Sequence, residues 1–168
     1  GCAHWKFDTP DAVRGAILIT RSQDGRFVLF AGDRKAWFYA IDANTGELLW
    51  KDKADDHTWA IITASPALYD DVVYVALSSF EELAGGSDQY ECCTFRGSVI
   101  AYESVTGKRL WKSSTVQEPM VKTRKLANGT QLWGPSGVAV WSQPTIDPKG
   151  GVLYITTGDS YSVPASAT

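Results

Sequence analysis

Short apolar runs alternate with polar residues along the whole chain, and tight turns rich in Asp and Gly separate them. A period of two residues is the pattern of a half-buried β-strand, and no amphipathic helix of any length competes with it. The pattern therefore predicts an all-β fold. The expected antiparallel strands lie at about 16–20, 27–31, 36–42, 47–51, 64–69, 72–77, 98–103, 108–112, 141–146 and 152–157.

The segment 35–51 recurs as 96–112, at an offset of 61 residues. In both copies a strand with alternating apolar residues leads into a Thr-Gly turn, where glycine supplies a positive φ, and a second strand ends in Trp-Lys. A tryptophan at the same place in each unit can pack between neighbouring units. A second strand–turn–strand unit recurs at 63–76 and 141–156, so each period holds four strands.

Four-stranded meanders with periodic Trp and Gly are typical of β-propeller blades. We expect blades at 13–51 and 61–112 and a half blade at 141–160, within a partial propeller domain that spans 1–168. An all-β sandwich is the alternative, but a four-strand repeat with an aligned tryptophan favours the propeller. Propellers close with about four to eight blades, so these units predict a fragment of a longer protein or assembly with other chains. A start at Gly1 rather than Met adds to the expectation of a fragment.

Strand parity predicts that the long loops share one face of the molecule. In a meander the chain changes end at each strand, so the loops after the second and fourth strands of a unit lie together, opposite the tight turns. Long loops at one end of a rigid scaffold usually carry binding and chemistry. The candidate residues that this rule places on one face are His57, Trp59, Cys92, Cys93, Arg96, Trp133, Ser136, Thr157 and Asp159.

Composition and charge narrow the classes of function. The 168 residues carry a net charge of −3 without a basic stripe, so nucleic acid is not an expected partner. No run of about 18 apolar residues occurs, so no membrane span is expected. Three cysteines cannot form a disulfide framework, and the sequence contains no Cys-x-x-Cys, P-loop, Gly-x-Ser-x-Gly or paired-histidine zinc motif.

Two of the three cysteines, Cys92 and Cys93, are neighbours. The Cα atoms of trans neighbours are about 3.8 Å apart, below the usual disulfide range of about 4.4–6.8 Å, so a bridge here would be strained and useless as a long-range staple. If the bridge forms, it provides a flat, stiff, apolar sulfur platform. The alternative is two small apolar residues that happen to touch, and the residues alone leave both interpretations open.

Two polar candidates accompany this pair. His57 follows Asp55 and Asp56 and could be a base that a carboxylate orients, or simply a polar loop residue. Arg96 follows Cys93 by three positions and could bind a carboxylate through two N–H groups, or be an exposed arginine beside a turn.

Two tryptophans, Trp133 and Trp141, flank the Gly-Pro-Ser-Gly turn at 134–137. They could stack on an aromatic ligand while the Ser136 hydroxyl and the backbone N–H groups of the turn hold anionic oxygens. The alternative for Trp141 is a packing role in a blade strand. Asp159 could coordinate Ca²⁺ through oxygen, or be a turn residue after glycine.

Several of these motifs resemble those of a known family. The segment 40–50, Ala-Ile-Asp-Ala-Asn-Thr-Gly-Glu-Leu-Leu-Trp, resembles the blade repeat of pyrroloquinoline quinone (PQQ) dependent alcohol dehydrogenases, or quinoproteins. Non-catalytic outer-membrane assembly scaffolds also carry this repeat. The segments 91–97, 133–137 and 157–162 together are similar to the polyvinyl alcohol dehydrogenase branch. The paired cysteines and the Pro-Ser-Gly loop are the more specific part, and the resemblance covers nearly the whole chain.

The resemblance implies an eight-bladed propeller with PQQ near its axis, stacked on a disulfide between adjacent cysteines. By position, Cys92 and Cys93 would form that platform. Arg96 would lie close to a quinone oxygen or carboxylate, and Ser136 and Gly137 match the turn that contacts the cofactor in this family.

The resemblance also implies a calcium site next to the cofactor. Thr157 belongs to the expected cofactor-binding set, and Asp159 stands where many relatives have a calcium-ligating Asn after Thr-Gly, so Asp159 is the expected metal ligand. Related enzymes carry a calcium-ligating Glu two residues after the Ser-Gly pair. Val138 and Ala139 follow that pair here, so this ligand is missing.

The activity implied is oxidation of primary or secondary alcohols, including polymers like polyvinyl alcohol, by hydride transfer to PQQ, with electrons passed to a c-type cytochrome. The catalytic Asp base of the family would lie beyond Thr168, so we expect the fragment alone to be inactive. The implied location is the bacterial periplasm or the exterior, where an oxidising compartment suits a disulfide. The alternative function is a non-catalytic propeller for protein contacts or outer-membrane assembly.

Overall fold

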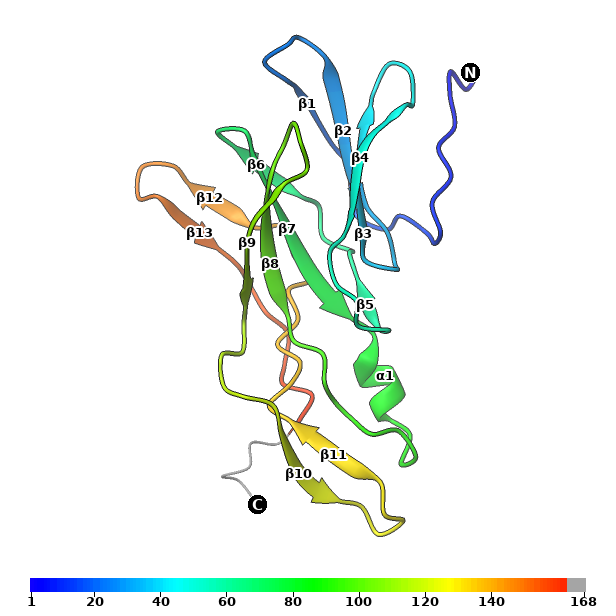
Figure 1. Cartoon of the computed structure of the whole chain (residues 1–168), viewed down its shortest axis with the longest axis vertical. Helices are drawn as coiled ribbons and strands as arrows, with labels where there is room; N and C mark the ends of the chain where they lie inside the picture. The colour runs from blue at the N-terminus through cyan, green and yellow to red at the C-terminus, as the bar shows by residue number, and fades with distance from the viewer. Residues whose placement is uncertain (163–168) are drawn as a thin grey trace.

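The computed structural model describes residues 1–162 as antiparallel sheets joined by turns and loops (Figure 1). Residues 163–168 of the expected domain lie outside the described part. The first sheet is a four-stranded meander whose neighbours in sequence are neighbours in space. Its strands are β1 (Leu18–Arg21), β2 (Phe27–Gly32), β3 (Trp37–Asp42) and β4 (Leu48–Lys53).

The second sheet repeats this meander and adds a short strand, β5 (Ala60–Ile61), which pairs with the far end of the longest strand. A third unit contributes a two-stranded hairpin, β12 (Thr145–Asp147) and β13 (Val152–Tyr154), which is shorter than predicted. The all-β expectation is confirmed, and the strands of both sheets lie close to their predicted positions. The strands of the second meander are β6 (Ala67–Tyr69), β7 (Val72–Ser79), β8 (Ser98–Glu103) and β9 (Arg109–Ser114).

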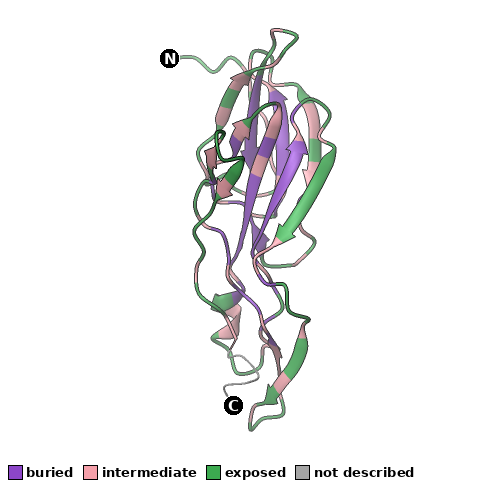
Figure 2. Ribbon diagram, turned by 90° about the vertical axis from the view of Figure 1, so that its left-hand side faces the viewer, coloured by how far each residue is buried: buried purple, intermediate pink, exposed green. Residues whose placement is uncertain are grey.

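The short strand β5, one helix and one hairpin inside the long loops were not predicted. The helix α1 (Glu81–Gly85) was not expected, because five residues are too few to show a helical period. The hairpin of β10 (Val121–Lys125) and β11 (Gln131–Gly134) stands largely in solvent. Its outer strand β10 is largely exposed (Figure 2), and its sequence Val-Lys-Thr-Arg-Lys lacks the apolar alternation of a half-buried strand.

The core lies between the faces of the two main sheets, where their central strands are buried (Figure 2). Phe38 is fully buried and stacks on Phe30 and Tyr102, with ring centroids 6.1 and 5.7 Å apart. Trp50 adds a third contact to Phe38 at 5.7 Å. Aromatic side chains bury large apolar areas, so this cluster joins the two sheets into one unit.

The expected packing of tryptophan between units is confirmed. The indole Nε1 of Trp50 donates a hydrogen bond to the carbonyl of Ser104 in the next sheet, 2.9 Å away. Trp5 near the chain start does the same to the first sheet, donating to the carbonyl of Ala43 at 3.0 Å. Ser104 lies 61 residues after Ala43, which is the period of the repeat, so the same tryptophan–carbonyl hydrogen bond occurs at equivalent positions of two units.

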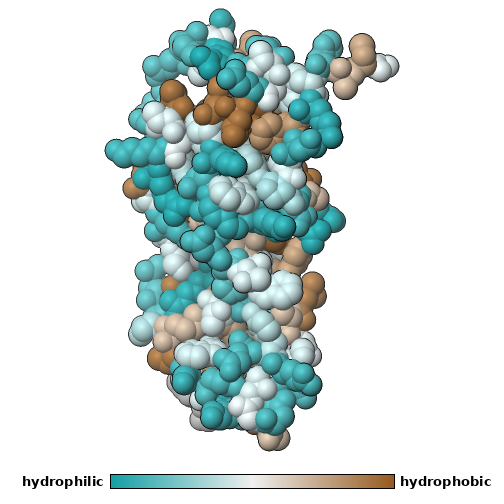
Figure 3. All heavy atoms as spheres, turned by 45° about the vertical axis from the view of Figure 1, so that its right-hand side comes forward, coloured by the Kyte–Doolittle hydropathy of each residue, from teal (hydrophilic) through white to brown (hydrophobic). Residues whose placement is uncertain are grey.

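Polar side chains cover most of the face in Figure 3, with apolar groups gathered towards the upper part of the molecule. Within residues 1–162, no helix has the length and apolar character needed to cross a bilayer.

Candidate functional site

The long loops gather at one end of the molecule, as strand parity predicted. Figure 1 shows α1 and the β10–β11 hairpin at this end, whereas the tight turns of β1–β2, β6–β7 and β12–β13 lie at the other. The loop residues described below therefore belong to one face, which we call the loop face.

Three segments of the loop face lie side by side through backbone hydrogen bonds. Gly137 donates its N–H to the carbonyl of Phe95 and accepts from the N–H of Gly97, both at 2.8 Å, which makes a parallel bridge between Arg96 and Gly137. The segment 157–160 pairs with the same turn from the other side. The structure thus brings the Arg-Gly, Ser-Gly and Thr-Gly motifs together, although they are far apart in the sequence.

Cys92 and Cys93 form a disulfide, which resolves the two interpretations that the sequence left open. The peptide bond between them is cis and their Cα atoms lie 3.0 Å apart, so the trans spacing assumed from the sequence is wrong. Cys93 is fully buried, whereas Cys92 is partly exposed. The carbonyl of Cys92 accepts a hydrogen bond of 2.7 Å from the backbone N–H of Trp133 on β11.

A cavity of about 330 Å³ opens beside this disulfide. Cys92 lies on one side of it, the end of α1 on another, and the β10–β11 hairpin closes it with Arg124 and Trp133. Among the predicted cofactor contacts only Cys92 lines the cavity. A larger cavity of about 420 Å³ lies between the two sheets at the turn end, and no predicted site residue lines it.

Ser136 is fully buried next to the cavity beside the disulfide. Its hydroxyl donates to the Oγ of Ser162 at 3.1 Å, and its backbone N–H donates to the same oxygen at 3.0 Å. Ser162 lines the cavity, so the Ser-Gly turn supports the cavity wall from behind.

Arg96 carries a buried donor without an acceptor. Its Nε donates to the carbonyl of Pro135 at 3.3 Å, but its Nη2 is buried and has no hydrogen-bond partner within residues 1–162. A buried N–H group without a partner is unfavourable, so this guanidinium fits an anionic ligand that would complete its hydrogen bonding.

Thr157 and Asp159, the two predicted site residues of the Thr-Gly motif, are exposed. Thr157 pairs with Val140 through a single bridge, and the backbone carbonyl of Asp159 accepts from the N–H of Val138 at 2.8 Å. In the part of the chain that the structure describes, no three His, Cys, Asp or Glu side chains lie close enough to hold a metal ion. No group of three such side chains therefore surrounds Asp159 within residues 1–162.

The two tryptophans that flank the Ser-Gly turn have different positions. Trp133 lines the cavity, and Lys122 lies 5.4 Å from the centre of its ring. Trp141 packs against the main core and lies 6.2 Å from the ring of Phe80. They do not sandwich one ligand, and Trp141 takes the packing role that the sequence left as its alternative.

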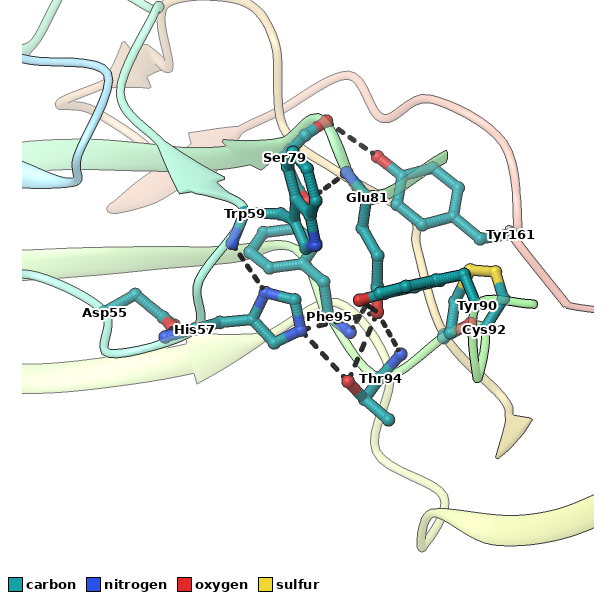
Figure 4. Close-up of polar contacts among 12 residues, drawn as sticks. Asp55, His57, Trp59, Ser79, Glu81, Tyr90, Cys92, Thr94, Phe95 and Tyr161 are labelled. Carbon is teal, nitrogen blue, oxygen red and sulfur yellow. Dashed lines mark hydrogen bonds and ion pairs between the residues drawn. A yellow bond between two sulfur atoms is a disulfide. The ribbon is translucent and has the colours of Figure 1, made fainter. Parts of the chain in front are cut away.

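Sequence reasoning missed Glu81, the most extensively bonded side chain of the loop face (Figure 4). Glu81 is fully buried at 0% exposure, and its carboxylate accepts from the backbone N–H groups of Thr94 and Phe95 at 2.8 and 2.7 Å. The Tyr90 hydroxyl donates to the same carboxylate at 3.1 Å. A glutamate two residues after the buried strand end Leu77–Ser79 was the available signal, but burial cannot be read from that position alone.

The ionisation of Glu81 follows from these contacts. Burial by itself raises the pKa of Glu81, but hydrogen bonds from His57, Thr94 and Phe95 more than offset this effect and leave the pKa below its ordinary value. The same carboxylate and burial raise the pKa of Tyr90 to about 12, with burial the larger cause. Glu81 is therefore an acceptor and Tyr90 a donor near neutral pH.

His57 does not use the carboxylates that the sequence suggested. Asp55 accepts the backbone N–H of His57 at 2.8 Å, and the carboxylate next to the imidazole is that of Glu81, 3.4 Å from Nε2 (Figure 4). The Nδ1 atom accepts the backbone N–H of Trp59 at 3.2 Å, and Nε2 lies 3.0 Å from the Thr94 hydroxyl. Both ring nitrogens are thus engaged within the protein.

Comparison with known proteins supports this picture. Residues 1–158 match the PQQ_2 family, described as outer membrane protein assembly factor BamB. The chain is 38% identical over 165 residues to a polyvinylalcohol dehydrogenase from Pseudomonas sp, covering 96% of this chain and 26% of the relative. It is 35% identical over 165 residues to a polyvinylalcohol dehydrogenase from Sphingopyxis sp. (strain 113P3), covering 96% and 25%.

A solved structure shares the fold. A europium-containing methanol dehydrogenase matches 79% of this chain and 24% of its own at 26% identity, with a TM-score of 0.57. The propeller expectation is thereby confirmed, and the predicted resemblance to quinoprotein alcohol dehydrogenases is confirmed by the curated relatives. The chain spans about a quarter of the length of the curated relatives it matches.

Proposed function

This chain belongs to the PQQ_2 family, and we propose that it is the part of a PQQ-dependent alcohol dehydrogenase that holds the cofactor. The observation that carries the proposal is the disulfide of adjacent cysteines beside a cavity on the loop face. Two relatives named polyvinylalcohol dehydrogenase support the proposed substrate class, primary or secondary alcohols that include polymers.

The residues of the loop face suit an anionic, aromatic cofactor. Cys92 and Cys93 offer an apolar sulfur surface on which a flat ring can stack, and Trp133 lines the same cavity with an aromatic ring. Arg96 offers the buried Nη2 donor that lacks an acceptor within residues 1–162, which suits a carboxylate. Ser136 and Gly137 hold this arrangement through the backbone and Ser162.

When bound, PQQ would supply the electrophilic quinone that accepts a hydride from the alcohol. The part played by this chain is to bind and orient that ring and to neutralise its charge through Arg96. We further propose, from the resemblance, that a catalytic Asp lies outside residues 1–168, that a c-type cytochrome accepts the electrons, and that the protein is periplasmic or secreted.

Calcium is the second ligand that the resemblance implies, and the described residues do not fit it. Asp159 is exposed, and Val138 and Ala139 stand where a further carboxylate would be needed. Within residues 1–162 no other His, Cys, Asp or Glu pair joins Asp159 to form a metal-binding group. Asp159 is therefore proposed as a calcium ligand only together with residues outside this chain.

A second candidate function is a non-catalytic scaffold, because the matched family is described by an outer membrane assembly factor. Such a scaffold needs the blade repeat but has no use for a sulfur surface or for a buried arginine Nη2 that lacks an acceptor within residues 1–162. The two hypotheses therefore differ in quinone binding.

The test uses the full-length protein that carries this chain, mixed with PQQ and Ca²⁺, an alcohol and a dye acceptor. We expect dye reduction, and we expect PQQ to quench tryptophan fluorescence with an affinity that a Cys92→Ala/Cys93→Ala variant loses. The matched control is Cys2→Ala, because Cys2 is an exposed cysteine outside the disulfide. If the protein reduces no dye, and if the Cys92→Ala/Cys93→Ala variant and the Cys2→Ala control bind PQQ equally, the proposal is overturned and the scaffold is favoured.

A further inference from the structure

Glu81 connects the helix α1 to the peptide that follows the disulfide. Its two carboxylate oxygens accept the N–H groups of Thr94 and Phe95, the first two residues after Cys93. Its own backbone N–H donates to the Oγ of Ser79 at 2.9 Å, which fixes the carboxylate relative to the end of β7. A buried carboxylate is stable only when hydrogen bonds replace its water, and here those bonds come from the disulfide loop.

Two sets of hydrogen bonds thus hold the disulfide loop. Glu81 binds the backbone of Thr94 and Phe95, which follow the disulfide, and the N–H of Trp133 binds the carbonyl of Cys92 at 2.7 Å. The first contact comes from a helix attached to the second sheet, and the second comes from the exposed hairpin β10–β11. The carboxylate is therefore the anchor that ties the disulfide to the buried part of the protein.

His57 fixes the orientation of the carboxylate. Because the backbone N–H of Trp59 donates to Nδ1, we assign the proton of the neutral imidazole to Nε2. That Nε2–H points towards the Thr94 hydroxyl at 3.0 Å and the Glu81 carboxylate at 3.4 Å. The imidazole also packs edge-on against Phe95, with ring centroids 5.6 Å apart.

We propose that Glu81 is a positioning residue that holds the Cys92–Cys93 platform in place, with His57 as the donor that orients its carboxylate. The effect of Glu81 on PQQ binding rests on the proposed function. Its effect on the stability of the disulfide loop is independent of that function, because it concerns contacts within this chain alone.

The first experiment compares Glu81→Gln with Glu82→Gln in the full-length protein, since Glu82 is exposed on the same short helix. A glutamine at 81 keeps the shape but directs an NH2 group at a backbone N–H, so one anchoring bond is lost. We expect PQQ affinity, read by fluorescence quenching, to fall by about tenfold or more in Glu81→Gln and to stay unchanged in Glu82→Gln.

A second readout is independent of the cofactor. The rate at which tris(2-carboxyethyl)phosphine reduces the Cys92–Cys93 bridge is followed by alkylation and mass measurement of the peptide. We expect Glu81→Gln to be reduced several-fold faster than the unchanged protein and Glu82→Gln. Equal reduction rates and equal PQQ affinities in all three folded proteins would overturn the inference.

Two substitutions of His57 provide a test if the Glu81→Gln protein does not fold. The His57 side chain is 20% exposed, and glutamine can present an N–H donor in place of Nε2–H, whereas leucine cannot. We expect His57→Leu to speed bridge reduction and His57→Gln to restore the slow rate at an equal melting temperature. Equal rates in this pair would overturn the role of the donor. Absence of PQQ binding in the unchanged protein would reject the proposed function but leave the reduction test valid.

Discussion

Trp50 of the first sheet lies directly on Gly107 of the second. A Cβ atom built on Gly107 would come within 2.5 Å of the indole Cδ2 of Trp50, so only glycine leaves room for the ring. Gly107 also has a φ of 72°, which its Thr-Gly turn requires. The indole then reaches the carbonyl of Ser104 at 2.9 Å, so the turn and the tryptophan lock the two sheets together.

Replacing Gly107 with alanine is expected to destabilise the protein by about 2–4 kcal/mol, because it combines a left-handed backbone with displacement of the indole. Gly151→Ala is the matched control, since Gly151 has a φ of 64° and no atom within 4 Å of a built Cβ. That control should cost only about 1 kcal/mol. Urea unfolding of both variants measures the difference, and equal losses would contradict the packing role of Trp50.

Replacement of Arg96 with methionine should separate ligand binding from stability. The Nη2 atom is buried without a partner in the described chain, so its removal should offset the loss of the Nε bond to the Pro135 carbonyl and leave the stability of the ligand-free protein within about 1 kcal/mol. PQQ affinity should fall by about tenfold or more because a charge-assisted hydrogen bond is lost. Arg14→Met, which removes one exposed positive charge, is the control for net charge. A clear loss of ligand-free stability in Arg96→Met would show that Arg96 serves the fold instead.

The lowered pKa of Glu81 predicts a loss of stability in acid. Its folded-state pKa lies below the ordinary value of 4.5, so the carboxylate stabilises the fold above that pH, and this contribution disappears as pH falls through the folded pKa. The ionisable groups that face it are His57 and Tyr90, and Tyr90 stays protonated because its pKa is about 12. Unfolding is best compared for the unchanged protein and Glu81→Gln, because His57 supplies the strongest of the bonds that lower the pKa of Glu81 and must stay in place. The difference between them should be large above about pH 4.5 and shrink below it, and a difference independent of pH would contradict an ionised Glu81.

Most of the scaffold follows from local chemistry that the sequence displays. Apolar alternation predicted the strands, the Thr-Gly turns predicted the repeat, and strand parity placed the disulfide on the loop face without any three-dimensional information. Parity succeeds because each antiparallel strand reverses the chain, whatever its side chains are. The structure also shows the bridge between the adjacent cysteines, which is one of the two interpretations that the sequence left open.

The contacts within the loop face did not follow from the sequence. Asp55 and Asp56 adjoin His57, yet the carboxylate beside the imidazole comes from Glu81, 24 residues further along the chain. Local sequence cannot rank carboxylates that long loops bring together. The β10–β11 hairpin was missed although Asn128-Gly129 is a strong hairpin signal, because its flanking strand is polar and exposed.

Gly137 provides the sharpest test of the junction between the three loop-face segments. It has a φ of 88°, and a Cβ at this position would lie 2.5 Å from the backbone N of Tyr161 and 2.7 Å from its Cγ. That N–H donates to the carbonyl of Ser136 at 3.1 Å, so a methyl group would push the segment around Tyr161 away from the Ser-Gly turn. Tyr161 and the adjacent Ser162 line the cavity beside the disulfide, and the cavity wall would move with them.

Gly137→Ala is therefore expected to lower PQQ affinity by more than about tenfold and stability by about 2–4 kcal/mol. Gly129→Ala is the matched control, because Gly129 has a φ of 92° and no atom within 4 Å of a built Cβ, at the tip of the neighbouring hairpin. It carries the same backbone strain without the collision, so its PQQ affinity should stay unchanged. Fluorescence quenching measures the PQQ affinity of both variants, and urea unfolding measures their free energy of unfolding. If Gly129→Ala weakened PQQ binding as much as Gly137→Ala, the contact with Tyr161 would not be what shapes the cavity, and backbone strain in either glycine turn would account for both losses.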